Sequence, residues 1–272
     1  MRKYCLSLLL LFLTLVSNAV EPPKREIRGV WLTTVYGLDW PHNPATTETG
    51  QKAQQRDVCD ILDRLQDANF NTVFLQVRMR GDVIWRSAIE PASKTFSGKY
   101  GMMPGYDPLA FVVDECHKRG MECHAWFVTF PLGTDKSVKE QGKLSVVRRQ
   151  PKLCKRHNGE WYLDPGVPGT SDYVLSLVKE LVNGYDIDGI HFDYIRYPEQ
   201  AKYFPDKNLY NKYGKKRPLA EWRRENINKM VYRIYDWVKS VKPWIQVSSS
   251  PLGKYNRIER VPNAGWTAYE SV

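Results

Sequence analysis

The sequence predicts an α/β protein of the (β/α)8 barrel type. Apolar strand-like runs alternate with segments whose apolar residues recur at helical spacing, which is typical of βαβ units around a parallel sheet. Connections from helix to strand are short, whereas those from strand to helix are long, at roughly 80–107, 130–170 and 198–218. Long loops therefore gather at the carboxyl ends of the strands, where barrels and doubly wound sheets place their sites. No GxGxxG or GxxxxGK motif follows a strand, which favours a barrel over a nucleotide-binding sheet.

Five runs have the length and apolar content of buried strands. They are 27–35, 71–79, 121–129, 189–197 and 245–250. A complete barrel needs eight strands, and residues 265–270 have the pattern of an approach to another helix. We therefore expect the barrel to be truncated in this chain after about five βα units.

Four segments between these strands place apolar residues at i, i+3, i+4 and i+7, the pattern of a helix with one buried face. The four sets are Val58, Ile61, Leu62 and Leu65; Leu109, Val112, Val113 and Cys116; Val174, Leu177, Val178 and Leu181; and Ile227, Met230, Val231 and Ile234. Asp107 and Pro108 form a start signal for the second helix, and Gly120 is placed to end it.

The first nineteen residues have the pattern of a secretory signal. Arg2 and Lys3 precede a short apolar stretch over 6–16, and Ser17-Asn18-Ala19 forms a small-residue cleavage site. We expect residues 1–19 to be removed and 20–272 to form one barrel domain, exported to the periplasm or the extracellular space. No later segment is long and apolar enough to span a bilayer, so no stable membrane insertion is expected.

The chain is basic. Its formal charge of +10 falls to +8 without residues 1–19, which carry two basic side chains and no acidic one. Outside the cytoplasm this charge favours an anionic envelope polymer or an acidic glycan, rather than nucleic acid, as the binding partner. The alternative is that the charge serves solubility alone.

The cysteines give no motif. Cys59, Cys116, Cys123 and Cys154 form no CxxC pair, so we expect buried thiols. An exported compartment permits one disulfide, which the sequence does not assign.

Side-chain alternation along the strands predicts a polar site inside the barrel. If Val73, Leu75 and Val77 face the helices, then Phe74, Gln76 and Arg78 face the interior. The same rule directs inward Glu122, His124 and Trp126 of the third strand, His191 and Asp193 of the fourth, and Gln246, Ser248 and Ser250 of the fifth. We predict substrate contacts at Gln76, Arg78, His124, Trp126, His191 and Arg196. The alternative for a lone histidine, glutamine or serine here is a hydrogen-bonded packing role.

Asp193 is the strongest catalytic candidate. A carboxylate at the end of a buried strand loses the free energy of its hydration, and ionisable groups with such costs concentrate at functional sites. An amidohydrolase would need an early His-x-His pair, and no metal-ligand spacing occurs, so no metal or cofactor is expected. No GxSxG elbow supports a serine hydrolase. Glycoside hydrolysis remains, since it needs paired carboxyl groups and aromatic surfaces for sugar rings. The aromatic candidates on the site face are Trp40, Trp85, Tyr100, Trp126, Trp161 and Tyr162.

Several ordered motifs resemble the glycosyl-hydrolase-like 10 family of exported bacterial proteins. They are Arg28-Gly29-Val30-Trp31, Gln76-Val77-Arg78, Pro104-Gly105-Tyr106-Asp107-Pro108-Leu109, His117-Lys118-Arg119-Gly120, His124-Ala125-Trp126-Phe127, Tyr162-Leu163-Asp164-Pro165-Gly166 and Asp188-Gly189-Ile190-His191-Phe192-Asp193. The resemblance covers about residues 25–272. It implies a (β/α)8 barrel that hydrolyses a glycan, with peptidoglycan strands as a known substrate class, and a domain that continues past residue 272.

A wider similarity to the α-amylase superfamily implies a nucleophile at Asp193. The arginine of that superfamily's motif is His191 here, and its glutamate acid has no counterpart in 245–251. The proton donor must then come from a strand-to-helix loop or from beyond Val272; the loop candidates are Asp164, Asp82, Glu90 and Glu199. Asp164 is the first choice, and its alternative role is to order the turn before a helix at Thr170.

Two basic loops are predicted on the site face, where they would attract an anionic glycan. The alternative is that their basic side chains are only exposed to solvent and bind nothing. Their residues are Arg148, Arg149, Lys152, Lys155 and Arg156 in one, and Lys202, Lys207, Lys212, Lys215, Lys216 and Arg217 in the other. The leading hypothesis is an exported glycosidase acting on a bacterial envelope glycan. The alternatives are a non-catalytic glycan-binding barrel and a metal hydrolase.

Overall fold

The computed structural model describes residues 26–214 and 216–250. The predicted signal over 1–19 and the expected helix approach at 265–270 lie outside the described residues.

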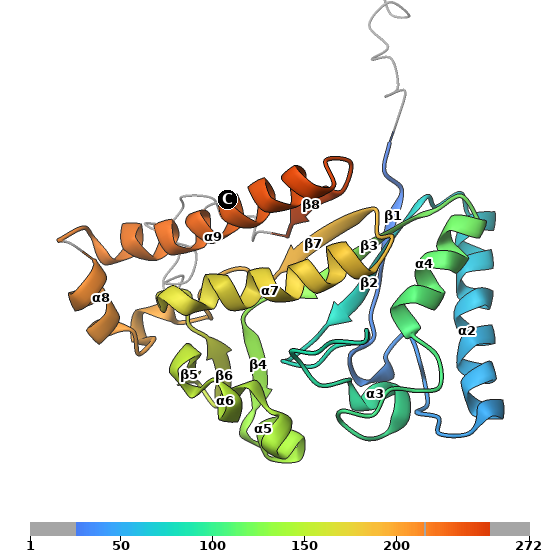
Figure 1. The fold of residues 1–272 in the computed structure, drawn as a ribbon, viewed down its shortest axis with the longest axis horizontal. Helices are drawn as coiled ribbons and strands as arrows, with labels where there is room; N and C mark the ends of the chain where they lie inside the picture. Colours follow the sequence, from blue (N-terminus) through green and yellow to red (C-terminus); the bar gives the residue numbers. More distant parts are fainter. Residues whose placement is uncertain (1–25, 215, 251–272) are drawn as a thin grey trace, which may run out of the picture.

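Five parallel strands form the central sheet (Figure 1). They are β1 (Gly29–Leu32), β2 (Thr72–Arg78), β3 (Glu122–Val128), β7 (Gly189–Asp193) and β8 (Gln246–Ser249). Each strand pairs in parallel with the next, in the order of the sequence. This is how consecutive βα units wind in a (β/α)8 barrel. The five predicted strands are therefore confirmed, although β7 ends at Asp193 rather than near residue 197.

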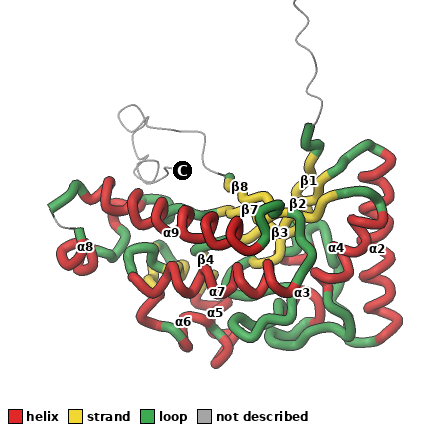
Figure 2. Tube along the Cα trace, turned by 45° about the horizontal axis from the view of Figure 1, so that its top comes forward, coloured by secondary structure: helices red, strands yellow, loops and turns green. Residues whose placement is uncertain are grey.

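The four predicted helices are confirmed and cover the outer face of the sheet (Figures 1 and 2). They are α2 (Glu48–Asp67), α4 (Pro108–Lys118), α7 (Pro168–Gly184) and α9 (Leu219–Val241), with α2 packing on α4 and α7 on α9. Asp107 caps α4 as predicted, because its side chain accepts a hydrogen bond from the Ala110 amide at 3.1 Å. No helix in the described ranges combines the length and apolarity needed to cross a membrane.

The two faces of the sheet differ as alternation predicts. Val73, Leu75 and Ile190 point toward the helices and are completely buried. On the opposite face the rings of Trp31 and Phe74 stack at 4.6 Å between centroids, and Phe74 lies 5.0 Å from the rings of both His124 and His191. This second face is the barrel interior.

The segment after β3 differs from the long loop that the sequence predicts. It contains a second sheet, with β4 (Pro131–Thr134), β6 (Glu160–Leu163) and β5 (Cys154–His157) in antiparallel order, together with α5 (Asp135–Gln141) and α6 (Val146–Arg149). Asn158 and Gly159 join β5 to β6 with φ values of 47° and 81°. Positive φ at both positions is what a two-residue type I′ hairpin turn requires, and Asn-Gly is its commonest sequence.

The remaining elements are short. They are α3 (Lys94–Ser97), α8 (Lys207–Tyr213) and the 3-10 turns η1 (Val35–Gly37), η2 (Gly142–Leu144), η3 (Pro151–Leu153) and η4 (Ala201–Tyr203).

The described cysteines are free thiols. Cys116, Cys123 and Cys154 are buried as predicted, whereas Cys59 is half-buried with its Sγ 3.5 Å from Oε2 of Glu115.

Candidate active site

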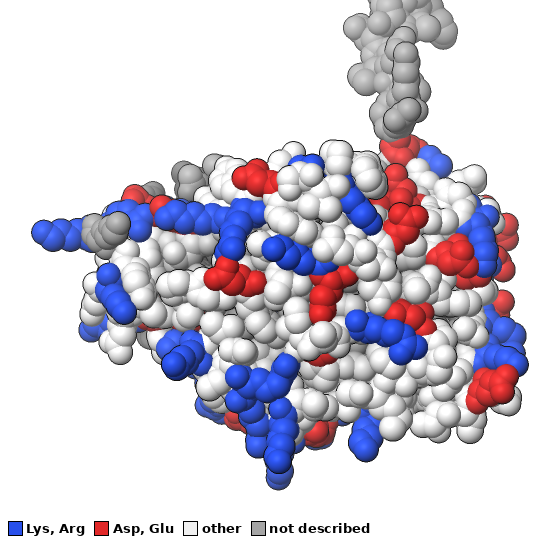
Figure 3. Space-filling model, viewed as in Figure 1, with Lys and Arg blue, Asp and Glu red and all other residues white. Residues whose placement is uncertain are grey.

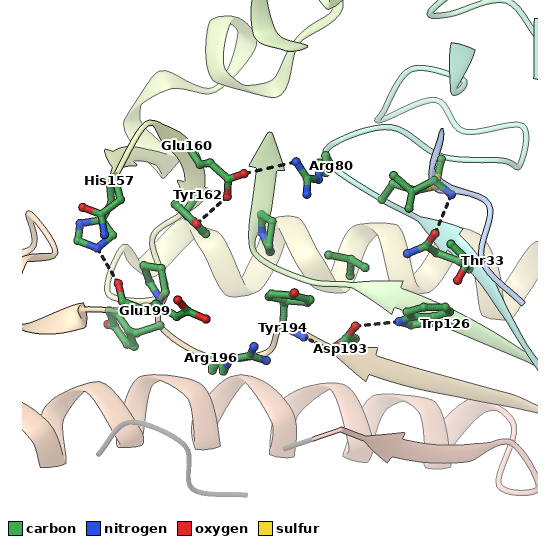
Figure 4. A pocket seen from close by; sticks show the side chains of 18 residues that line it. Thr33, Arg80, Trp126, His157, Glu160, Tyr162, Asp193, Tyr194, Arg196 and Glu199 are labelled. Carbon is green, nitrogen blue, oxygen red and sulfur yellow. Dashed lines mark hydrogen bonds and ion pairs between the residues drawn. The ribbon is translucent and has the colours of Figure 1, made fainter. Parts of the chain in front are cut away.

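A cavity of about 630 Å³ lies at the carboxyl ends of the parallel strands (Figure 4). Three parts of the chain line it: the strand ends, the β5–β6 hairpin and the loop after β7. Four predicted site residues line this cavity, namely Asp193, Gln76, Trp126 and Arg196. The topology therefore brings together side chains that are more than a hundred residues apart in sequence.

Asp193 is held by two hydrogen-bond donors. Its Oδ2 accepts from the indole nitrogen of Trp126 at 3.1 Å, and its Oδ1 accepts from the backbone amide of Tyr194 at 2.7 Å. Tyr194 has a φ of 49°, in the left-handed region that bulky residues rarely adopt, and this change of direction ends β7. The carboxylate consequently points into the cavity in a fixed orientation.

Gln76 links the ends of β1 and β2. Its Oε1 accepts hydrogen bonds from the amides of Thr34 at 3.1 Å and Val35 at 2.9 Å. The hydroxyl of Thr34 in turn donates to the backbone carbonyl of Gln76 at 2.7 Å. With its oxygen engaged, Gln76 has its Nε2 group as the donor for a molecule in the cavity.

Glu160 is a cavity carboxyl that the sequence reasoning missed. Its Oε2 accepts a hydrogen bond from the Tyr162 hydroxyl at 2.8 Å, and its Oε1 lies 3.4 Å from Nη1 of Arg80. Burial, together with the hydrogen bond to Glu160, raises the pKa of Tyr162, so this phenol stays protonated as a donor. The Asn158-Gly159 turn signal could have revealed the hairpin that carries Glu160.

Glu199 is the one predicted loop carboxyl, among those the structure describes, that lines the cavity. It is exposed, and its backbone carbonyl accepts a hydrogen bond from Nε2 of His157 at 2.9 Å, which joins the hairpin to the loop after β7. Asp82 is buried and accepts from the Arg80 amide at 3.2 Å. The cavity thus contains Asp193, Glu160 and Glu199 as its acidic groups.

Arg78 does not face the barrel interior, so this prediction was wrong. The pairing of β2 with β3 shifts between Gln76 and Arg78, which places Arg78 opposite Phe127 instead of continuing the inward alternation. A bulge of this kind redirects the side chains that follow it. Arg78 is completely buried; its Nε and Nη2 donate to the two carboxylate oxygens of Glu90, each at 2.7 Å, and its Nη1 donates to the backbone carbonyls of Val128 and Thr129. The Tyr173 hydroxyl of α7 also donates to Glu90, at 2.8 Å.

Asp164 does not reach the cavity either, which contradicts its predicted role as proton donor. It is completely buried, and its Oδ1 accepts from the Gly166 amide at 2.8 Å, while Thr170 Oγ1 donates to the Asp164 carbonyl at 2.7 Å. These contacts match the alternative role of ordering the turn before α7. Burial raises the pKa of Asp164 to about 6.

His124 and His191 lie in the barrel interior outside the cavity lining. His124 is 2.9 Å from Glu122 Oε2, and its ring occupies the space above Gly189, where any Cβ would overlap the imidazole. His191 interacts with the hydroxyls of Ser248, at 2.9 Å, and Ser250. Burial lowers the pKa of His191, so its neutral form is favoured. The predicted substrate contacts at both histidines are replaced by packing and hydrogen bonds within the barrel.

Two of the six predicted aromatic residues, Trp126 and Tyr162, line the cavity. Trp40 and Trp85 are buried in the core. The Trp161 indole donates to Asp135 Oδ1 at 2.8 Å, outside the cavity. Tyr100 lies under the ammonium of Lys94, also outside it. Core packing therefore explains Trp40 and Trp85, which the sequence pattern assigned to the site.

The two predicted basic loops do not line the cavity at any of their described residues; Lys215 lies outside the description. In Figure 3 the basic side chains on the helix-covered side gather toward α8 and over α5 and α6. The cavity takes its positive charge from Arg80 and Arg196 instead.

A metal site is not formed by the part of the chain that the structure describes, since no three of its His, Cys, Asp or Glu side chains are grouped to hold an ion.

Two solved structures share the fold at low sequence identity. Alpha-L-fucosidase isoenzyme 2 from Paenibacillus thiaminolyticus gives a TM-score of 0.55 at 18% identity, over 83% of this chain and 32% of that one. A hypothetical protein from Ruminiclostridium thermocellum ATCC 27405 gives a TM-score of 0.51 at 17% identity, over 81% of this chain and 96% of that one. These likenesses agree with a (β/α)8 barrel architecture.

Sequence comparison gives relatives with higher identity. Glycosyl hydrolase DigH of Escherichia coli (strain K12) is 36% identical over 257 residues, which are 89% of this chain and 58% of DigH. Glycosyl hydrolase YngK of Bacillus subtilis (strain 168) is 33% identical over 250 residues, which are 89% of this chain and 48% of YngK. The chain therefore spans about half the length of these relatives. The sequence pattern of the family described as Glycosyl hydrolase-like 10 matches residues 26–271, and this chain belongs to that family.

Proposed function

We propose that this protein is an exported glycoside hydrolase that cleaves a glycosidic bond in a bacterial envelope glycan, with peptidoglycan glycan strands as its substrate. One observation carries the proposal: Asp193 shares its cavity with a second oriented carboxyl group, Glu160. Hydrolysis by this route needs two carboxyl groups around one bond, whereas binding alone does not. Membership of the glycosyl hydrolase-like 10 family supports the same reaction class.

Asp193 acts as the nucleophile or as the charge stabiliser. The reaction develops positive charge on the sugar ring, and a carboxylate beneath the ring either bonds to the anomeric carbon or stabilises that charge. The Trp126 indole and the Tyr194 amide already hold both Asp193 oxygens, so little reorganisation accompanies the step.

Glu160 serves as the acid and base partner. In its protonated form it donates to the leaving oxygen, and in its ionised form it takes a proton from water. Tyr162 and Arg80 orient the Glu160 side chain from two directions. Glu199, which is exposed and comes from a different loop, is the second candidate for this role.

Export and an anionic substrate are parts of the same proposal. The signal-like segment over 1–19 supports export, and the formal charge of +8 on the rest of the chain supports attraction to an anionic polymer. Inside the cavity, Arg80 and Arg196 supply cationic groups.

The decisive experiment is Asp193→Asn, tested on purified peptidoglycan glycan strands. The change should lower the release of reducing ends about 1,000-fold or more while leaving the circular dichroism spectrum unchanged. Asp135→Asn is the matched control, because Asp135 pairs with Arg156 outside the cavity and its loss should leave the rate unchanged. Full activity of Asp193→Asn would contradict the assignment. Wild-type protein that binds the strands and never cleaves them would instead be a glycan-binding barrel.

A further inference from the structure

The loop after β7 places Tyr194 and Arg196 on the cavity side. Tyr194 is 47% exposed, and both side chains line the cavity. Between and after them, Ile195 and Tyr197 are 7% and 0% exposed and pack into the core. The buried side chains anchor the loop, so the other two are held at the cavity surface.

Tyr194 fixes the position of Arg196 relative to Asp193. The Arg196 guanidinium carbon lies 4.4 Å from the centroid of the Tyr194 ring, a close cation–π contact. The Tyr194 backbone is bound to Asp193 Oδ1 and stays in a left-handed conformation that costs energy for a bulky residue. In Figure 4 the Tyr194 ring lies between Arg196 and Asp193. The surroundings thus hold a guanidinium group in the same cavity as the proposed nucleophile, with the Tyr194 ring between the two.

The other cavity arginine is placed differently. Arg80 has its Nη1 3.4 Å from Glu160 and its guanidinium 5.7 Å from the Tyr36 ring. Its charge is therefore directed at the proposed acid and base partner. Arg196 is the cation on the Asp193 side, where one of the two sugars flanking the scissile bond would lie.

We infer that Arg196, oriented by Tyr194, binds the carboxylate of an acidic sugar next to the bond that is cleaved. A planar guanidinium recognises a carboxylate through two parallel hydrogen bonds, and stacking on a ring lowers the entropy lost on binding. This inference rests on the proposed function and deepens it. Arg196 selects carboxylate-bearing glycans over neutral ones, and Tyr194 is its positioning residue.

The test compares peptide-free peptidoglycan strands with the same strands after chemical reduction of their muramic acid carboxyl groups. Wild-type protein should cleave the native strands about 10- to 100-fold more efficiently, the range expected for one charge-assisted contact. Arg196→Gln should lose this preference, because it should slow cleavage of native strands far more than cleavage of reduced strands. Arg196→Lys should keep a small part of it, since an ammonium group lacks the planar fork.

Two further variants separate recognition from general effects. Arg156→Gln removes an exposed arginine that pairs with Asp135 outside the cavity, and it should keep the full preference. Tyr194→Phe keeps the ring and should keep the preference, whereas Tyr194→Leu should reduce it by raising KM for native strands alone.

Equal loss on both substrates in Arg196→Gln, or no preference in wild-type protein, would overturn the inference. Binding of both strand types to Asp193→Asn, with and without Arg196→Gln, gives a readout that does not need turnover. A binding preference for native strands that disappears with Arg196→Gln supports the role of Arg196, whether or not wild-type protein cleaves the strands. If wild-type protein cleaves neither substrate, the proposed hydrolysis is rejected while the recognition role of Arg196 is still supported.

Discussion

The indole nitrogen of Trp126 lies 3.1 Å from Oδ2 of Asp193, so a side chain of β3 orients the carboxylate at the end of β7. The two strands are direct neighbours, with Val128 opposite Asp193 and Trp126 opposite His191. Trp126 lies two residues before Val128 on β3, so its side chain reaches forward along the strand to the Asp193 carboxylate. The contact depends on strand register, and under the proposed function it gives Trp126 the role of orienting Asp193.

Trp126→Phe should lower kcat about tenfold or more, because it removes a hydrogen bond to the proposed nucleophile Asp193 and keeps an aromatic ring in place. Steady-state rates on glycan strands measure the effect. Trp161→Phe is the matched control, since it removes an indole bond to Asp135 outside the cavity. If both changes lower kcat equally, the loss reflects a general effect of replacing a tryptophan, and it does not support the role of Trp126 in orienting Asp193.

Glu160→Gln should lower kcat by about 100-fold or more, the usual contribution of a positioned acid and base. Tyr162→Phe should give a smaller loss, because it removes the hydroxyl that orients Glu160 but not the carboxyl itself. Glu199→Gln measures the competing assignment in the same assay. A large loss in Glu199→Gln beside a small one in Glu160→Gln would transfer the role to Glu199.

Arg78→Leu should destabilise the fold by about 3–5 kcal/mol, because it leaves the Glu90 carboxylate buried without an opposite charge. The double change Arg78→Leu with Glu90→Leu should recover part of that loss, since no unpaired charge then remains. Urea unfolding measures both free energies. Normal stability of Arg78→Leu together with weakened glycan binding would restore the substrate role that the sequence predicted.

Asp164 should make stability fall as the pH rises from about 4 to about 6. Burial raises the pKa of the Asp164 carboxyl in the folded protein to about 6 from its ordinary value of 3.8, so between these pH values the folded protein holds a proton that the unfolded chain releases. The stabilising contribution is complete below about pH 4 and lost above about pH 6. The shift of about two pKa units corresponds to about 3 kcal/mol.

Asp164→Asn isolates this effect, because the amide stays neutral and keeps an oxygen for the Gly166 amide. Urea unfolding at several pH values gives the free energy of unfolding of both proteins. Between about pH 4 and about pH 7, this free energy should fall by about 3 kcal/mol less in Asp164→Asn than in wild-type protein. Identical pH profiles for the two proteins would show that the carboxyl is not desolvated in solution.

The elements of the fold were predictable because their signals are local. A helix shows its buried face within one or two turns of sequence, and all four predicted helices are present. Alternation likewise placed Gln76 and Trp126 on the inner face, and the strand-end position identified Asp193. The β5–β6 hairpin also had a local signal in Asn158-Gly159, which the long-loop interpretation overlooked.

The sequence by itself determined the βα order, the family and Asp193 at the end of its strand, because periodicity and short motifs are carried by neighbouring residues. Only the tertiary structure decided which polar residues share the cavity. A bulge turned Arg78 toward Glu90, packing buried Asp164, and the hairpin brought Glu160 to the site. These outcomes depend on strand register and on contacts between segments that are distant in the sequence. Such contacts decide which polar groups are removed from water and become structural, and which ones stay accessible to a substrate.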